Sequence, residues 1–369
     1  MTKETEDTRL IRWNFDVRTG DHLYMRQSPE NPGKHITDEN PYIEIDPEKL
    51  DYYAELYPLT KFVKGMDAQS YVNKLTKIMY DTKYGKGLAK LFNRKYRPRI
   101  AIDLIRMRLE AKGIKKPKIA KNRETDLGKL KEQIIEFAQK QDFIAGFTKL
   151  DRRYISDEND KIFPYDTVLI LGMKMEKDQV MEIPHPGYKT RKLYIYETYK
   201  KSGKRVHIVA DFIRSKGYKC LARVPIDGMI KVGLHAVNAG IGQFTTNGLI
   251  VTEKYGTLIR FCAINIDAEI PIDSPRDLNA DEFCSRCRLC QKCCPEEAIP
   301  KEAFEWRGGV KRKVHDKKCL SSLFSPDRPL CGVCLKVCPY NNFGYDNCME
   351  TIPQYYLYNK MASVLNEAV

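Results

Sequence analysis

The chain has 369 residues, of which 42% are hydrophobic and 30% charged, with a formal net charge of +14. This length allows two or three domains, and the composition is that of a soluble globular protein. No apolar run approaches the roughly 18 residues that a membrane-spanning helix needs. The N-terminus has neither the apolar core of a secretory signal nor a twin-arginine pair. We therefore expect a cytoplasmic protein without a membrane span.

Residues 1–125 predict an N-terminal extension that is irregular at first and then helical and basic. Residues 1–60 show no hydrophobic period. Apolar residues then recur at helical spacing in two places, Val72–Leu75–Met79 and Ile100–Leu104–Met107. Between residues 84 and 124 stand fourteen Lys or Arg against three acidic residues. Such a stretch suits nucleic acid, an acidic membrane face or an acidic partner, and the alternative is a solvated helix face.

Residues 126–275 predict an α/β domain, because strands alternate with helices. The expected elements are, in chain order, a helix over 127–138, a buried strand over 168–171, helix over 191–215, a short strand around Leu221, a helix over 229–239 and strands over 249–252 and 258–266. Gly203 is expected to break the long helical stretch, and Gly217 suits its C-terminal cap. The sequence has no G-x-G-x-x-G and no Walker loop, which argues against dinucleotide or ATP chemistry.

Ten of the twelve cysteines lie between Cys284 and Cys348. In a long chain without a secretory signal, such crowding indicates metal binding rather than disulfides. Residues 284–295 contain C-x2-C-x2-C-x3-C-P, and residues 331–339 contain C-x2-C-x3-C-P. This pattern predicts a bacterial-type double 4Fe-4S ferredoxin domain over 276–345, followed by a tail over 346–369.

The fourth cysteine of each such run binds the other cluster. One cluster is therefore expected on Cys284, Cys287, Cys290 and Cys338. The other is expected on Cys294, Cys331 and Cys334 with Cys319, which is the nearest cysteine upstream of the second run. A four-cysteine zinc site is the alternative, but two C-P endings favour two cubanes. The surplus Cys293 and Cys348 are expected to be structural thiols, and Cys220 and Cys262 to lie in the core.

Residues 232–273 resemble the core of reductive dehalogenases. The matching segments are Ala239–Gly242, Asn247–Thr252, Tyr255–Gly256, Arg260 and the segment that starts at Asp267. The order of the cysteine runs, with the lone Cys319 between them, also resembles that family and its relatives, the epoxyqueuosine reductases. The resemblance covers about residues 126–345, and residues 1–125 match nothing in either family.

This resemblance implies an oxidoreductase with a nitroreductase-like α/β domain that binds cobalamin base-off, without a protein ligand to cobalt. An external donor, such as ferredoxin, flavodoxin or a reductase, would supply electrons through the two 4Fe-4S clusters to cleave a carbon–halogen bond of an organohalide. The expected cofactor-binding residues are Gly240, Gly242, Asn247 and Gly248. The sequence lacks a D-x-H-x-x-G motif, which agrees with base-off binding, and His235 is expected to pack in the core.

The resemblance also points to a proton donor. The family uses a Tyr beside a cation, about a helix length before a Gly-Tyr pair, which is Gly217-Tyr218 here. That spacing selects Tyr199, with Tyr196 as second choice. Arg260 is the candidate cation, because a nearby positive charge favours the phenolate and eases proton release. The alternatives are a packed aromatic residue and a structural arginine.

The choice between the two related families decides the substrate. Asp227 occupies a place where dehalogenases tend to have Asn and epoxyqueuosine reductases a catalytic Asp, although a helix N-cap is the alternative. Residues 243–248 lack the Trp and Lys of epoxyqueuosine reductases, and only 31 residues follow Cys338. We therefore favour an organohalide over tRNA or another non-halogenated substrate. An electron-transfer protein without a substrate of its own is the third hypothesis.

Overall fold

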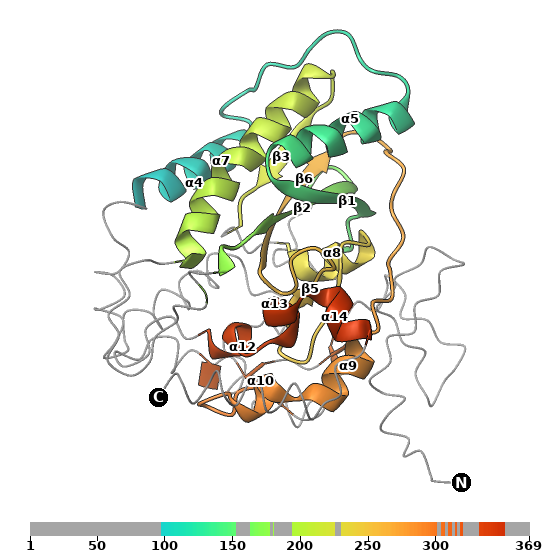
Figure 1. Cartoon of the computed structure of the whole chain (residues 1–369). Coiled ribbons are helices and arrows are strands. Elements are labelled where there is room, and N and C mark those ends of the chain that lie inside the picture. The colour runs from blue at the N-terminus through green and yellow to red at the C-terminus, as the bar shows by residue number, and fades with distance from the viewer. Residues whose placement is uncertain are drawn as a thin grey trace.

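The computed structural model describes residues 97–152, 163–177, 180, 194–225, 230–300, 304–306, 309–311, 314–315, 318–319 and 332–350. Within these residues the fold is mixed α/β, as predicted, with a sheet above a group of short cysteine-bearing helices (Figure 1). The helical pattern expected around Val72–Met79 lies outside the described residues, as does Asp227.

The sheet has four strands in the order β1-β2-β6-β3, and all neighbours are antiparallel. The strands are β1 (Phe143–Lys149), β2 (Thr167–Lys174), β3 (Cys220–Arg223) and β6 (Ile259–Ile266). The register of β2 and β6 runs from Thr167 opposite Ile266 to Lys174 opposite Ile259. The predicted strands at 168–171, around Leu221 and at 258–266 are thus confirmed, whereas β1 was not predicted.

Three helices cover one face of the sheet: α4 (Arg97–Ala111), α5 (Leu127–Lys140) and α7 (Tyr194–Ser215). Alternate residues of β2 define the two faces, because Leu169 and Leu171 pack among these helices while Val168 and Ile170 point the other way. The Asp126 side chain accepts a hydrogen bond from the Lys129 N–H and caps α5. These contacts create the main hydrophobic core.

Gly203 does not break α7, contrary to the prediction, because the helix is continuous from Tyr194 to Ser215. A Cβ at Gly203 would lie 3.2 Å from Oδ2 of Asp103, so the glycine permits α4 and α7 to pack closely. Nearer the C-terminal ends of both helices, Arg214 Nη2 lies 2.7 Å from Oε2 of Glu110, and both side chains are only 1% exposed. The basic segment is therefore anchored to α7 by a buried ion pair.

The opposite face of the sheet packs against α8 (Val232–Asn238), with Ala236 and Ala239 among its buried contacts. His235 is fully buried there, as predicted. Its Nε2 accepts a hydrogen bond from the Asp151 N–H at 3.1 Å, and its Nδ1 lies 3.1 Å from the Lys231 carbonyl oxygen. A two-stranded hairpin of β4 (Gln243–Phe244) and β5 (Ile250–Val251) follows α8.

The cysteine-rich segment consists of short elements below α8 and β5 (Figure 1). Its elements are α9 (Ala280–Cys287), α10 (Leu289–Lys292), β7 (Phe304–Trp306), β8 (Gly309–Lys311), α12 (Val333–Lys336), α13 (Pro339–Phe343) and α14 (Tyr345–Glu350). α8 and the β4–β5 hairpin thus lie between the sheet and the cysteine-bearing helices.

Candidate metal centre

Three cysteines of one short run and a fourth from far along the chain line one small cavity. Cys284 and Cys287 lie on α9, Cys290 lies on α10 and Cys338 precedes α13. Arg288 lies between Cys287 and Cys290 and adopts a left-handed conformation with φ of 52°. This residue ends α9 and precedes α10. The cavity has a volume of ≈ 20 Å³. The structure therefore brings together the four residues expected to hold one cluster, and their role as ligands stays a prediction.

The buried position of these thiols disfavours their ionised form. Burial raises the pKa of Cys284, Cys287 and Cys290 above that of an ordinary thiol, and it raises the pKa of Cys338 to about 12. Hydrogen bonds from backbone groups of Tyr340 and Asn341 and from the Thr257 side chain partly oppose that effect at Cys338. Metal binding would thus have to displace protons from buried sulfurs.

The donor set fits an iron–sulfur cluster. Thiolate sulfur is the ligand that such clusters use, and each cysteine of a cubane binds a different iron. Among the described residues, no three His, Cys, Asp or Glu side chains converge closely enough to hold a single metal ion. The Tyr340 hydroxyl is buried without a hydrogen-bond partner, and Tyr340 lines the same cavity. A group with sulfur acceptors would satisfy that hydroxyl.

The second expected ligand set is described only in part, because Cys331 lies outside the described residues. Cys294 Sγ accepts a hydrogen bond from the Ala298 N–H at 3.2 Å. Cys319 is exposed, and Cys334 lies on α12, which packs against α10 through Leu289 and Val337. The second cluster therefore stays a prediction.

The remaining cysteines divide between the two parts of the molecule. Cys220 and Cys262 are buried in the core of the sheet, as predicted. Cys348 is also buried, beside Cys284 and Cys338, and burial raises its pKa to about 12. Cys293 is half-buried next to Leu289 and Val337.

The glycine-rich segment expected to bind the cofactor forms a tight turn above the cysteine cavity. A Cβ at Gly242 would overlap the carbonyl oxygen of Val251, and Gly240 and Gly248 have φ of +65° and +74°. Asn247 Oδ1 accepts hydrogen bonds from Thr245 Oγ1 at 2.6 Å and from the Leu249 N–H at 3.2 Å. Thr245, Thr246 and Asn247 line the same cavity as the four cysteines. A cofactor-binding role for the glycines and Asn247 stays a prediction.

Polar contacts that were not predicted join the β4–β5 hairpin and the loop before β6 to the cysteine-rich segment. Asn341 Oδ1 accepts a hydrogen bond from the Thr257 N–H at 2.8 Å, and Asn341 Nδ2 donates to the Leu335 carbonyl oxygen at 2.8 Å. Gln243 Oε1 accepts hydrogen bonds from the N–H groups of Leu278 and Ala280, at 2.9 and 3.1 Å. We call these contacts the seam. The one local signal for them was Gly256, where a Cβ would lie 2.8 Å from the Tyr340 carbonyl oxygen.

Tyr199 and Arg260 belong to the same side of the sheet. Arg260 alternates with Cys262 and Ile264, which face the helices α4, α5 and α7, and its Nε is buried without a hydrogen-bond partner. Tyr199 is half-buried on α7. Both residues keep their predicted roles as proposals. The described side chains do not include Tyr196 or Asp227.

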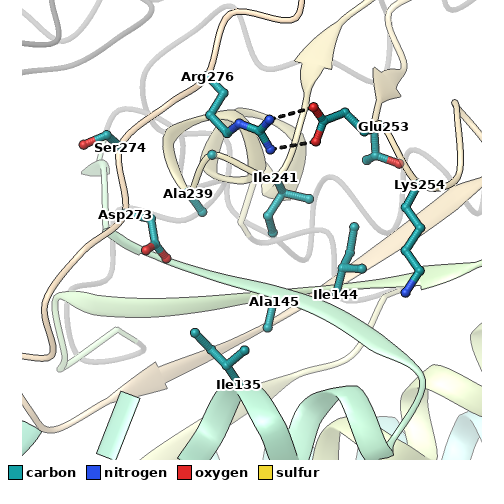
Figure 2. Close-up of a pocket in the computed structure, with 12 residues that line it drawn as sticks. Ile135, Ile144, Ala145, Ala239, Ile241, Glu253, Lys254, Asp273, Ser274 and Arg276 are labelled. Carbon is teal, nitrogen blue, oxygen red and sulfur yellow. Dashed lines mark hydrogen bonds and ion pairs between the residues drawn. The ribbon is translucent and has the colours of Figure 1, made fainter. Parts of the chain in front are cut away.

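A separate pocket of ≈ 410 Å³ lies beside β1 (Figure 2). Arg276 binds Glu253 through two hydrogen bonds of 2.7 and 2.6 Å at its rim, and Asp273 binds Lys131 at 2.5 Å. Apolar side chains form much of the remaining lining, namely Ile135, Ile144, Ala145, Ala239 and Ile241. Lys254 also lines the pocket.

No family model matches the chain. Among curated proteins it is similar to a tetrachloroethene reductive dehalogenase of Desulfitobacterium hafniense, at 32% identity over 157 residues, which are 39% of this chain and 28% of that protein. The corresponding dehalogenase of Sulfurospirillum multivorans is 25% identical over 199 residues, 50% of this chain and 38% of that protein. An epoxyqueuosine reductase of Cyclobacterium marinum is 25% identical over 123 residues, 29% of this chain and 36% of that protein.

Solved structures share the fold. The chain superposes on a catabolic reductive dehalogenase, NpRdhA, with a TM-score of 0.66 at 15% identity, covering 85% of this chain and 46% of that one. A reductive dehalogenase described for B12-dependent dehalogenation gives a TM-score of 0.55 at 18% identity, over 69% of this chain and 37% of that one. The chain spans less than half the length of the relatives it matches. The resemblance inferred from the sequence is confirmed, and the relatives that carry it are oxidoreductases.

Proposed function

We propose that this chain, a relative of the reductive dehalogenases and epoxyqueuosine reductases, is a corrinoid- and iron–sulfur-dependent reductase that cleaves a carbon–halogen bond of an organohalide. One observation carries the proposal: Cys284, Cys287, Cys290 and Cys338 share a cavity with the turn at Thr245–Asn247. That turn belongs to the segment whose sequence resembles reductive dehalogenases. The expected metal site and the expected cofactor site are therefore adjacent.

When bound, the clusters supply single electrons and a base-off cobalamin supplies the bond-cleaving chemistry. The overall reaction consumes two electrons from an external donor and one proton, breaks the carbon–halogen bond, forms a carbon–hydrogen bond and releases halide. In this proposal the Tyr199 hydroxyl gives the proton, and Arg260 favours the phenolate that remains. Gly240, Gly242, Asn247 and Gly248 would form the wall that holds the corrinoid, because the positive φ of Gly240 and Gly248 permits the tight turns of this segment.

The second cluster of the proposal uses Cys294, Cys319, Cys331 and Cys334. Cys290 and Cys334 are close enough that each would raise the cost of ionising the other. Two clusters held by these neighbouring ligand sets would give a short path for electrons from a protein donor, such as ferredoxin or flavodoxin, to the corrinoid. A cytoplasmic location is part of the same proposal.

A second candidate is an epoxyqueuosine-reductase-like activity on tRNA or another non-halogenated substrate. The 25% identity to epoxyqueuosine reductase over 29% of the chain favours it, and so does Asp227, which occupies the place of that family's catalytic Asp. A third candidate is an electron-transfer protein without its own substrate. Such a protein would not need the α/β domain.

Anaerobic purification with added cobalamin, followed by visible and electron paramagnetic resonance spectra, tests the cofactor. We expect cob(II)alamin together with roughly eight iron atoms per chain, as two four-iron clusters require. Full cluster loading without corrinoid would contradict the reductase and favour the electron-transfer protein.

The Tyr199→Phe variant tests the proton donor. Loss of the hydroxyl should lower turnover by roughly a hundredfold or more and leave the cluster and corrinoid spectra unchanged. Tyr165→Phe is the matched control, because Tyr165 lies far along β2 from Arg260. Tyr165 is near Thr167, the first residue of β2, whereas Arg260 pairs with Met173 near the last. Equal turnover of both variants and the wild type would remove Tyr199 from the role. Turnover of an epoxyqueuosine-containing tRNA but of no organohalide would select the second candidate.

A further inference from the structure

The basic segment over 84–124 does not present all its charges to solvent. Arg99 binds Asp103 at 2.8 Å, and Arg106 binds both Glu110 and Asp211, at 2.8 and 2.7 Å. The Arg123 guanidinium lies over the Tyr218 ring at 4.2 Å. These three arginines make contacts within the fold. Their contacts account for only part of the positive charge of the segment.

A second group of cations in the same segment is directed outward. Its members are exposed, and within the part of the chain that the structure describes no ion pair joins any of them to an acidic residue. They are Arg108, Lys112, Lys115, Lys116, Lys118 and Lys121. Six positive charges thus lie within 14 residues of sequence, at the end of α4 and in the segment after it.

Large apolar side chains are exposed among these cations. Ile102 and Ile105 are each 55% exposed, and Ile114 is 68% exposed. Ile102, Ile105 and Leu109 share one face of α4 by their spacing, and the opposite face buries Asp103, Met107 and Glu110 toward α7. Three of the four exposed large hydrophobic residues in the described chain therefore belong to this one region. Single exposed apolar residues are ordinary, but such a group calls for a partner.

We propose that the outer face of α4 and residues 112–121 form a docking surface for an anionic lipid membrane. Anionic headgroups attract clustered Lys and Arg, and apolar side chains on the same surface enter the boundary between headgroups and acyl chains. Arg108 and Lys112 lie within one turn of Ile105 and Leu109, which places charge beside the apolar stripe. None of the described helices is long and apolar enough to cross a bilayer, so the attachment is to the membrane surface.

Nucleic acid is the other acidic partner that six cations could bind, and the isoleucines argue against it. Phosphate contacts need cations and hydrogen-bond donors, and unpaired bases stack on aromatic side chains. Exposed isoleucines serve neither purpose. The exposed Ile102, Ile105 and Ile114 in this basic region are therefore the observation that favours lipid over RNA.

Vesicle co-sedimentation of the full chain tests the proposal, with vesicles of phosphatidylcholine alone and of phosphatidylcholine mixed with phosphatidylglycerol. We expect binding to the anionic vesicles only. Two variants, Ile102→Ser/Ile105→Ser and Lys115→Gln/Lys116→Gln/Lys118→Gln, should each weaken it by at least roughly tenfold. The matched controls are Ile272→Ser, at another exposed isoleucine, and Lys129→Gln/Lys140→Gln/Lys204→Gln, at exposed lysines on α5 and α7. Both controls should bind as the wild type does.

Circular dichroism and iron content should be equal in all variants, because every substituted side chain is exposed. Failure of the wild type to bind anionic vesicles would overturn the proposal, and so would unchanged binding by the isoleucine variant. A tRNA that binds at the same salt concentration, and whose binding depends on the lysines but not on the isoleucines, would assign the surface to nucleic acid instead. None of these outcomes depends on the corrinoid or on turnover.

Discussion

The sheet and the cysteine-rich segment bury different kinds of side chain. Around the sheet, fully buried aliphatic and aromatic residues come from all four strands and from α4, α5 and α7. In the cysteine-rich segment the buried group consists of a few apolar residues together with Cys284, Cys338 and Cys348. Apolar burial is enough to stabilise the first region. The second has little apolar core of its own, so we expect its folding to depend on metal binding.

Two buried cysteines, one from each region, give the largest expected contrast. Cys338→Ala removes a predicted ligand, so iron content should fall by roughly half and turnover should be lost. Cys262→Ala removes a core thiol of β6, so iron should be unchanged and the unfolding free energy should fall by only about 1 kcal/mol. Iron and acid-labile sulfide analysis of both variants measures this difference in cluster content. Full iron content in Cys338→Ala would remove that residue from the ligand set.

Two buried leucines make the same comparison through packing. Leu130 on α5 is fully buried in the core of the sheet, and Leu335, next to Cys334 in sequence, is buried on α12. Leu130→Ala should lower the unfolding free energy of the α/β region by about 2–5 kcal/mol without faster iron loss. Leu335→Ala should mainly accelerate the release of iron to a chelator. Denaturant unfolding and chelator kinetics measure the two effects, and equal iron loss from both variants would show that the regions fold as one unit.

The sequence predicted best the features that depend on neighbouring residues. The helix over 127–138 and the strand over 168–171 were correct because their apolar period is continuous. The loop that brings Cys284, Cys287 and Cys290 to one cavity is also local. β1 was missed because Gly146 interrupts a short apolar run, and Gly203 was misread because Asp103, the contact that requires a glycine there, lies on another helix. Apart from Gly256, the seam had no local signal, since Thr257 and Asn341 are 84 residues apart.

Asn341→Ala tests whether the seam couples the two regions. The variant leaves the Thr257 N–H without its acceptor and the Leu335 carbonyl oxygen without its donor. Loss of buried hydrogen bonds of this kind costs about 1–3 kcal/mol. We expect scanning calorimetry of the cluster-loaded protein to change from one transition to two. Asn347→Ala is the control, because its Nδ2 donates to the Phe343 carbonyl oxygen at an exposed site. Two transitions already present in the wild type would show that the seam does not couple the regions.

The smallest expected effect is a pH dependence confined to the sheet region. His207 on α7 is buried, and its Nε2 lies 3.1 Å from the Asp103 carbonyl oxygen. Nε2 must therefore carry the proton, while Nδ1 is buried without a partner. Burial, followed by the charge of Arg106, lowers the pKa of His207 below its usual value of 6.5. The folded protein resists a proton that the unfolded chain accepts.

The contribution of neutral, buried His207 to the unfolding free energy is complete above pH 6.5. It is lost as the pH falls toward the lower pKa of the folded state. Between those limits the unfolding free energy of the sheet region should fall by at most about 1.4 kcal/mol per pH unit. His207→Gln should remove that slope, because the amide can still donate to the Asp103 carbonyl oxygen but does not titrate. Denaturant unfolding from pH 7.5 down to about pH 5, a range in which an ordinary histidine titrates but most carboxylates do not, measures this slope. An unchanged slope in His207→Gln would assign the acid sensitivity to other groups. If the same substitution changed the pH dependence of iron loss, the two regions would be less independent than their cores indicate.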